Sequence, residues 1–250
     1  MSRWIAVCLV SLSLVAGSAA RWPARSAEQV DLLLVLAADV SRSIDDQKFE
    51  LERRGYAAAL GDPKVLGAIS SGPTGRIALA FVEWAGSGSQ RLVIDWTLIK
   101  DANDAKAFAG RLLESPRSFA DRTAIGAGID FAVTQFARCP YTSDRRVVDV
   151  SGDGTNNSGR DVRAARDEAL SKDVTTINGL VILSDTPIPY NPEHTNPPGG
   201  LENYYRENVI GGTNAFVMVA ENFESFGKSI IAKLIREIST LPPSPDSSRG

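Results

Sequence analysis

Three oxygen-bearing side chains stand two residues apart in the string Asp39-Val40-Ser41-Arg42-Ser43. A carboxylate and two hydroxyls on one tight turn offer the oxygen ligands that Mg²⁺ and similar hard cations prefer. The alternative is that Asp39, Ser41 or Ser43 caps a following helix, because Asp and Ser are favoured N-cap residues. The string alone leaves metal binding and helix capping both open.

Two further segments carry the same kinds of atoms. Thr123 places a hydroxyl just before a predicted helix, and Asp153, between Gly152 and Gly154, places a carboxylate just after a predicted strand. In an open α/β sheet, ligands bind at the carboxyl ends of the strands. We therefore expect Thr123 and Asp153 to meet Asp39 and its serines at one edge of a sheet.

The elements that must position these residues follow from the hydrophobic pattern. Residues 30–38 form a nearly continuous apolar run, which is typical of a strand buried on both faces. Residues 76–84 and 90–98 are β-rich runs whose linker is too short for a helical crossover, so one of them must run antiparallel. The rest alternates, with helices expected at 44–60, 102–113, 124–137, 162–170 and 223–238 and strands at 147–150, 176–183 and 215–220. Such alternation predicts a sheet covered by helices.

Together, these segments resemble the metal-ion-dependent adhesion site of von Willebrand A domains, whose pattern is D-x-S-x-S, then a lone Thr, then an Asp followed by Gly. Order, separation and strand context match over most of the chain. The resemblance implies a three-layer α/β fold of von Willebrand A or Rossmann-like type. In such a fold, a mostly parallel central sheet has one antiparallel edge strand and helices on both faces. The resemblance also implies a domain that binds and does not catalyse.

The resemblance further implies a role for each residue of the pattern. Ser41, Ser43 and Thr123 correspond to hydroxyls that contact the metal, and Asp39 and Asp153 to carboxylates that hold it mainly through water. The implied cation is Mg²⁺ or Mn²⁺, with Ca²⁺ as a further alternative. Neutral hydroxyls leave most of the cation's charge in place, so the metal accepts an Asp or Glu carboxylate from a partner protein, as is typical of this family.

A long Pro-rich stretch, Ser184 to Gly200, lacks helical periodicity and follows a predicted parallel strand. A loop in that position emerges at the edge of the sheet where the metal is expected. We expect Tyr190, Glu193 and His194 to help select the partner. The alternative is that the loop only covers the sheet.

Two other functions stay open. A metal near two aspartates can activate water, so a metal-dependent hydrolase is the main alternative. His194 is the single histidine, and the sequence has no G-x-S-x-G or G-x-x-x-x-G-K-[ST] motif, which argues against a serine hydrolase or a P-loop enzyme. The other alternative is a scaffold with a structural metal. A net charge of -3 argues against nucleic acid as a partner.

The first residues are typical of a signal peptide. Arg3 precedes an apolar run at 4–16 and a group of small residues, so cleavage is expected after Ala20. The apolar run is shorter than the roughly 20 residues that span a membrane, and no later segment is long enough to do so. We expect a von Willebrand A-like domain at 28–240, a disordered tail at 241–250, and a mature protein in the periplasm or outside the cell. This layout resembles exported bacterial A-like proteins with no assigned function.

Overall fold

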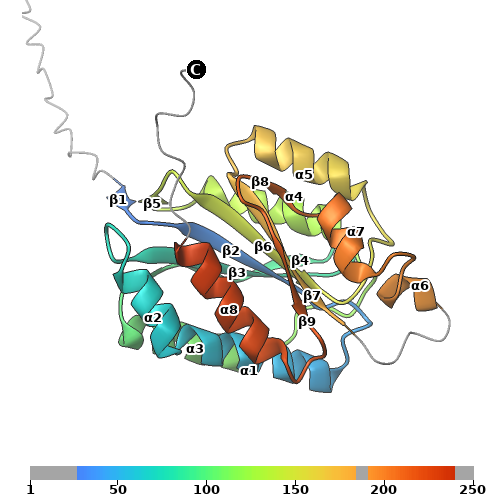
Figure 1. Ribbon diagram of the computed structural model, residues 1–250, viewed down its shortest axis with the longest axis horizontal. Coiled ribbons are helices and arrows are strands. Elements are labelled where there is room, and N and C mark those ends of the chain that lie inside the picture. The colour runs from blue at the N-terminus through green and yellow to red at the C-terminus, as the bar shows by residue number, and fades with distance from the viewer. Residues whose placement is uncertain (1–26, 184–190, 240–250) are drawn as a thin grey trace, which may run out of the picture.

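The computed structural model of the chain describes residues 27–183 and 191–239. The strands of its central sheet are β2 (Leu33–Asp39), β3 (Ile77–Trp84), β4 (Gln90–Ile99), β6 (Arg146–Gly152), β7 (Thr176–Ile182), β8 (Gly211–Gly212) and β9 (Val217–Ala220). Their order is β4-β3-β2-β6-β7, and β8 and β9 both pair with β7 (Figure 1). A separate small sheet pairs β1 (Glu28–Gln29) with β5 (Tyr141–Thr142).

Most neighbouring strands run parallel: β2 with β3 and β6, and β7 with β6 and β9. Strand β4 is antiparallel to β3, as the short linker between them requires. The predicted mostly parallel sheet with an antiparallel edge strand is therefore confirmed. One detail differs, because β8 adds a second antiparallel pairing with β7. Its two glycines carry no side chains from which a strand pattern could be recognised.

The apolar run predicted as a central strand is β2, which is buried along its whole length. Leu34 and Leu36 pack into one core layer, whereas Leu33 and Val35 pack into the other. Successive side chains of a strand point to opposite faces, so a continuous apolar run supplies both layers. The first layer is covered by α1 (Asp46–Leu60), α2 (Pro63–Ser70), α3 (Ala102–Glu114) and α8 (Phe226–Ser239). The second is covered by α4 (Ile125–Phe136), α5 (Val162–Ser171) and α7 (Leu201–Asn208) (Figure 1).

Helix α2 does not follow from the sequence pattern, in which Gly61-Asp62-Pro63 indicates the end of a helix. Helix α1 does end at Leu60. Asp62 then accepts the backbone N–H of Lys64 at 2.8 Å, and Pro63 occupies the first turn of the next helix. Proline favours the start of a helix because its missing N–H is not needed there. The same residues therefore end one helix and begin another.

The segment after β7 contains more helix than its Pro-rich sequence indicates. Within the stretch Ser184 to Gly200, a single helical turn, α6 (Pro192–Thr195), is present. Helix α7 follows it, and two of its eight residues, Leu201 and Tyr205, are buried. In Figure 1, α6 lies at the opposite end of the sheet from β1.

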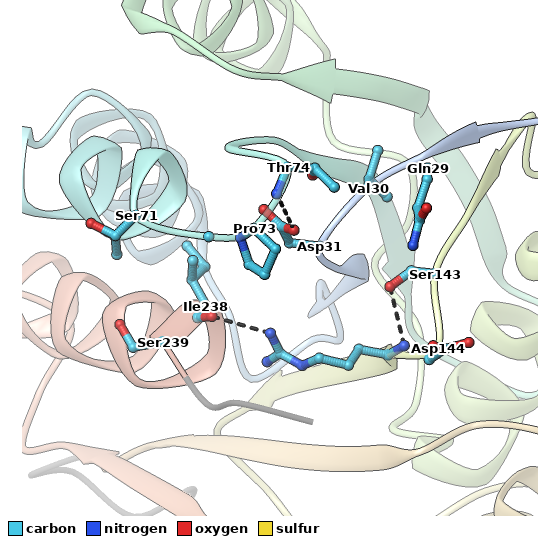
Figure 2. A pocket seen from close by; sticks show the side chains of 13 residues that line it. Gln29, Val30, Asp31, Ser71, Pro73, Thr74, Ser143, Asp144, Ile238 and Ser239 are labelled. Carbon is cyan, nitrogen blue, oxygen red and sulfur yellow. Dashed lines mark hydrogen bonds between the residues drawn. The ribbon is translucent and has the colours of Figure 1, made fainter. Parts of the chain in front are cut away.

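At the amino ends of the strands, the chain forms a partly open pocket of about 250 Å³ (Figure 2). Arg145 reaches the C-terminus of α8, where its guanidinium donates to the carbonyl oxygen of Glu237 and, at 3.1 Å, to that of Ile238. The Asp31 carboxylate accepts the N–H of Thr74 at 2.8 Å. These polar groups are engaged by neighbouring backbone and close this end of the sheet, opposite the predicted metal site.

No helix within residues 27–183 and 191–239 has the length and apolar character to cross a membrane. The expected leader at 1–20 and the tail at 241–250 lie outside the described residues. The described residues fill most of the domain expected at 28–240.

Candidate metal centre

The first turn of the site leaves the carboxyl end of β2 at Asp39, which is fully buried. Its Oδ1 accepts the backbone N–H of Ser41 at 2.7 Å, and the hydroxyl oxygens of Ser41 and Ser43 lie 3.1 Å apart. Helix α1 is capped instead by Asp45, whose Oδ1 accepts the N–H of Lys48 at 2.9 Å. The capping alternative is therefore wrong for Asp39, Ser41 and Ser43.

Asp153 joins this turn from the neighbouring strand. Because β6 pairs with β2 in parallel, the two carboxyl ends meet, and Asp153 directly follows Gly152, the last residue of β6. The Ser43 hydroxyl donates to Asp153 Oδ1 at 2.5 Å. A Cβ on Gly152 would crowd the Tyr205 hydroxyl and lie 3.1 Å from Asp39 Oδ2. A glycine at this position lets the two strand ends approach each other.

Thr123 comes from the loop before α4 and is 1% exposed. Its backbone N–H donates to Asn157 Oδ1 at 2.9 Å, and its carbonyl oxygen accepts the N–H of Asn157 at 2.9 Å. This reciprocal pair fastens the Thr123 loop to the loop that carries Asp153. Asn157 does not stand out in the sequence, where its only signal is the polar stretch after Asp153. The Thr123 hydroxyl takes no part in the pair and lies 3.2 Å from Nε2 of His194.

Asp39 and Asp153 are buried carboxylates, and each has one oxygen that is not hydrogen-bonded to the described residues. Within the described residues, Oδ2 of each accepts no hydrogen bond. Burial raises the pKa of both carboxyls, and the charge of Asp153 raises the pKa of Asp39 further. The Ser43 hydroxyl and the Lys48 ammonium, 3.8 Å from Asp153 Oδ2, act in the opposite direction on the pKa of Asp153. A cation beside these oxygens would satisfy them and offset their repulsion.

The donor set fits a hard divalent cation. In the described part of the chain, no group of three or more His, Cys, Asp or Glu side chains is placed to hold a metal ion by itself. Hydroxyl oxygens from Ser41, Ser43 and Thr123 must therefore supply part of any coordination shell. Mg²⁺ accepts such a shell because it usually keeps several waters and binds through only one or two carboxylates.

The residues expected to select a partner lie in different surroundings. Glu193 is exposed, whereas His194 is buried against Thr123, and Tyr190 lies outside the described residues. A pocket of about 420 Å³ opens beside them, lined by Arg42, Ser43, Asp121, Arg122, Thr123, Asn157, Asn191 and His194. The pocket lining contains acidic and basic side chains and two of the predicted metal ligands, Ser43 and Thr123. The pocket therefore offers a polar side chain of another molecule a route to the site.

Solved structures with a similar fold cover most of this chain. Proximal thread matrix protein 1 from the mussel byssus is 12% identical with a TM-score of 0.59, over 84% of this chain and 49% of that one. A second structure of it, with a zinc-occupied MIDAS motif, is 14% identical with a TM-score of 0.57, over 85% and 49%. A von Willebrand factor type A protein from Catenulispora acidiphila is 15% identical with a TM-score of 0.54, over 84% and 43%. Our chain thus spans about half the length of these proteins.

At such low identities the likeness shows the fold alone, and it confirms the resemblance to von Willebrand A domains. No curated protein matches the sequence. A family model described as "Protein of unknown function (DUF1194)" matches residues 29–242. The match includes the central sheet, the helices of both layers and every candidate site residue. The chain therefore belongs to the DUF1194 family, and it has the fold of a von Willebrand A domain.

Proposed function

We propose that this domain binds a divalent cation where β2 and β6 end, and uses it to hold an acidic side chain of a partner protein without catalysing a reaction. The observation that carries the proposal is the buried pair Asp39 and Asp153, each with an Oδ2 atom that accepts no hydrogen bond from described residues. Burying two like charges is costly unless a cation offsets them. The zinc-occupied MIDAS motif of the mussel protein, which shares the fold, supports a divalent metal in this proposal.

Each residue of the predicted set has a task in this proposal. Ser41, Ser43 and Thr123 would contact the cation through their hydroxyls, and Asp39 and Asp153 would hold it mainly through water. Asp39 fixes the turn by accepting the Ser41 N–H, and Asp153 orients the Ser43 hydroxyl. When bound, the cation supplies an electrophilic position that a carboxylate can fill. Oxygen ligands favour Mg²⁺ or Mn²⁺, and Ca²⁺ is the alternative to compare.

The partner would approach over the pocket beside the site. Glu193 is exposed and adjoins His194, which lines that pocket, and we assign Glu193, together with Tyr190 and His194, to the choice of partner. A Glu193→Lys variant should capture a different amount of the partner while its affinity for the cation stays the same. Unchanged capture would remove Glu193 from the partner surface.

Export is part of the same proposal, since the N-terminal pattern of Arg3 and the apolar run at 4–16 predicts cleavage after Ala20. Mass spectrometry of the protein from cell fractions would give the first residue of the mature chain. A mature chain that retains residues 1–20 would contradict cleavage.

Affinity capture tests the binding function. Immobilised protein is incubated with an extract of the source organism in Mg²⁺ or in EDTA, beside Asp39→Ala and the matched control Asp167→Ala, which removes an exposed carboxylate on α5. We expect capture only in Mg²⁺ and only by the wild type and Asp167→Ala. Capture that persists in EDTA would refute metal bridging. Thermal stabilisation by Mg²⁺ without metal-dependent capture would favour a structural metal, and turnover of a captured protein would favour a hydrolase.

A further inference from the structure

His194 is the one histidine of the sequence, and it is held against the candidate site in a fixed orientation. The residue is only 4% exposed. The Thr155 N–H donates to the carbonyl oxygen of His194 at 2.8 Å, and Thr155 Oγ1 lies 3.4 Å from Nδ1 of the ring. The other ring nitrogen, Nε2, lies 3.2 Å from Thr123 Oγ1. One nitrogen therefore faces Thr155, and the other faces a residue of the metal site.

Gly154 makes room for the ring. A Cβ on Gly154 would overlap the imidazole of His194, so a residue with a side chain here would push the ring away. Asp153, Gly154 and Thr155 are consecutive, and they provide a carboxylate at the site, space for the ring and a partner for Nδ1. Histidines that bind metals are usually held in this way, with the second ring nitrogen hydrogen-bonded so that tautomer and orientation are fixed.

The spacing of the donor atoms fits neighbouring ligands of a single cation. Ligands at about 2.0–2.1 Å from a metal are ~2.9 Å apart at a right angle in an octahedral shell and ~3.3 Å apart in a tetrahedral one. Thr123 Oγ1 and His194 Nε2 are 3.2 Å apart, and the Ser41 and Ser43 hydroxyls are 3.1 Å apart. Both pairs fall within that interval, so the ring nitrogen can enter the shell beside Thr123 while its loop stays in place.

We propose that Nε2 of His194 is a direct ligand of the cation, an inference that rests on the metal site proposed above. Imidazole nitrogen favours Co²⁺, Ni²⁺ and Zn²⁺, whereas Mg²⁺ and Ca²⁺ prefer oxygen. A set of hydroxyls and carboxylates that gains one nitrogen therefore shifts its preference toward the later transition metals. In this role, His194 determines which cation the domain selects.

Co²⁺ is the probe for this assignment, because a directly bound imidazole gives hyperfine-shifted proton signals in NMR spectra and the chain has a single histidine. Titrations of Co²⁺ and of Mg²⁺ are followed by calorimetry for the wild type, His194→Gln and Asp39→Ala. We expect shifted imidazole signals in wild type loaded with Co²⁺. In His194→Gln, the Co²⁺ affinity should fall about tenfold or more, while the Mg²⁺ affinity changes by less than about threefold.

The two proposals fail in different ways. If wild type binds Co²⁺ without shifted imidazole signals, or if His194→Gln binds Co²⁺ as tightly as wild type, the His194 ligand is wrong. The metal site itself survives that result when Asp39→Ala abolishes binding. If wild type binds neither Co²⁺ nor Mg²⁺, both proposals are wrong. The wild-type spectrum decides the question even if His194→Gln fails to fold.

Discussion

Strand β6 leads to two buried aspartates four residues apart, and the molecule treats their charges in opposite ways. Asp149, within the strand, lies 2.6 Å from the ammonium of Lys233 on α8, which also contacts Glu237 at 2.5 Å. Asp153, beyond the end of the strand, has the Ser43 hydroxyl and an ammonium 3.8 Å away. Lys233 gives the first aspartate a cation in direct contact, whereas the second keeps an Oδ2 atom that accepts no hydrogen bond from described residues, and our proposal places a cation from solution there.

A third buried carboxyl group, that of Glu52, avoids a buried charge in another way. Glu52 on α1 accepts the hydroxyl of Ser151 at 3.0 Å, and Ser151 precedes Asp153 by two residues. Burial raises the pKa of Glu52 to about 8, so this side chain keeps its proton at neutral pH. A lysine for Asp149, a proton for Glu52 and, in our proposal, a metal for Asp39 and Asp153 are thus three ways to neutralise buried carboxylates in one fold.

The largest effect is expected from Lys233→Met. The change leaves Asp149 and Glu237 buried without their ammonium, and breaking a buried ion pair from one side costs about 3–5 kcal/mol. Urea unfolding in EDTA measures the loss. Lys48→Met is the matched control and should cost less than about 1 kcal/mol, because the Lys48 side chain is partly exposed and its ammonium is 3.8 Å from Asp153. Equal losses in the two variants would contradict the contrast between the two aspartates.

The proton on Glu52 predicts a pH dependence. The pKa in the folded state, about 8, lies above the ordinary value of 4.5, so the folded chain keeps a proton that the unfolded chain releases. The stability of wild type should therefore fall relative to Glu52→Gln as pH rises, by roughly 3–4 kcal/mol between about pH 5 and about pH 8. Urea unfolding of both proteins from about pH 5 to about pH 8 in EDTA tests this. Parallel stability curves would show that Glu52 is not held neutral.

The proposed metal site predicts that Asp39→Asn changes the stability of the fold in opposite directions in Mg²⁺ and in EDTA. Free Mg²⁺ at about 100 times its Kd should stabilise the wild type by about 2.7 kcal/mol, because the cation binds only the folded state. Asp39→Asn should lose this response, and in EDTA it should be more stable than wild type, because one of two repelling carboxyls is gone. Thermal unfolding in Mg²⁺ and in EDTA measures both effects. A variant that still responds to Mg²⁺ would exclude Asp39 from the site.

The smallest expected effect concerns Asn157, which positions Thr123 without reaching the cation. Asn157→Ala removes the acceptor of the Thr123 N–H and should cost about 1 kcal/mol of stability. Its affinity for Mg²⁺ should fall by about tenfold, as is usual when a group that orients a ligand is lost. Asn156→Ala is the matched control, and calorimetry should find its affinity unchanged. Equal affinities for Asn157→Ala and wild type would mean that Thr123 needs no such support.

The sequence predicts the sheet and the edge at which the site forms, because both follow from local patterns. The apolar run of β2 requires burial on both faces, and parallel pairing with β6 brings Asp39 and Asp153 to one edge. The place of Thr123 beside Ser43 in the pocket at this edge also agrees with its predicted position just before a helix. None of these steps needs knowledge of distant side-chain contacts.

The rest depends on packing that one sequence does not reveal. Lys233 and Glu237 look like an ordinary surface pair one helical turn apart, yet both are buried. His194 lies in a Pro-rich stretch whose sequence does not indicate burial, yet its ring is buried against Gly154. Glu52 is one of many charges on α1. In each case the tertiary contact decides the role, and the residue type does not.

The pocket that Arg145 helps to line marks the end of the sheet at which the described chain begins and ends. Gln29, near the start of the described chain, and Ser239, at its end, both line this pocket (Figure 2), and Asp39 lies at the opposite end of β2. The two ends of the described chain thus lie at the same end of the sheet. A tether attached beside Gln29 or Ser239 would leave the proposed metal site facing away from the tether, so a pull between the tether and a partner bound at that site would run along the strands.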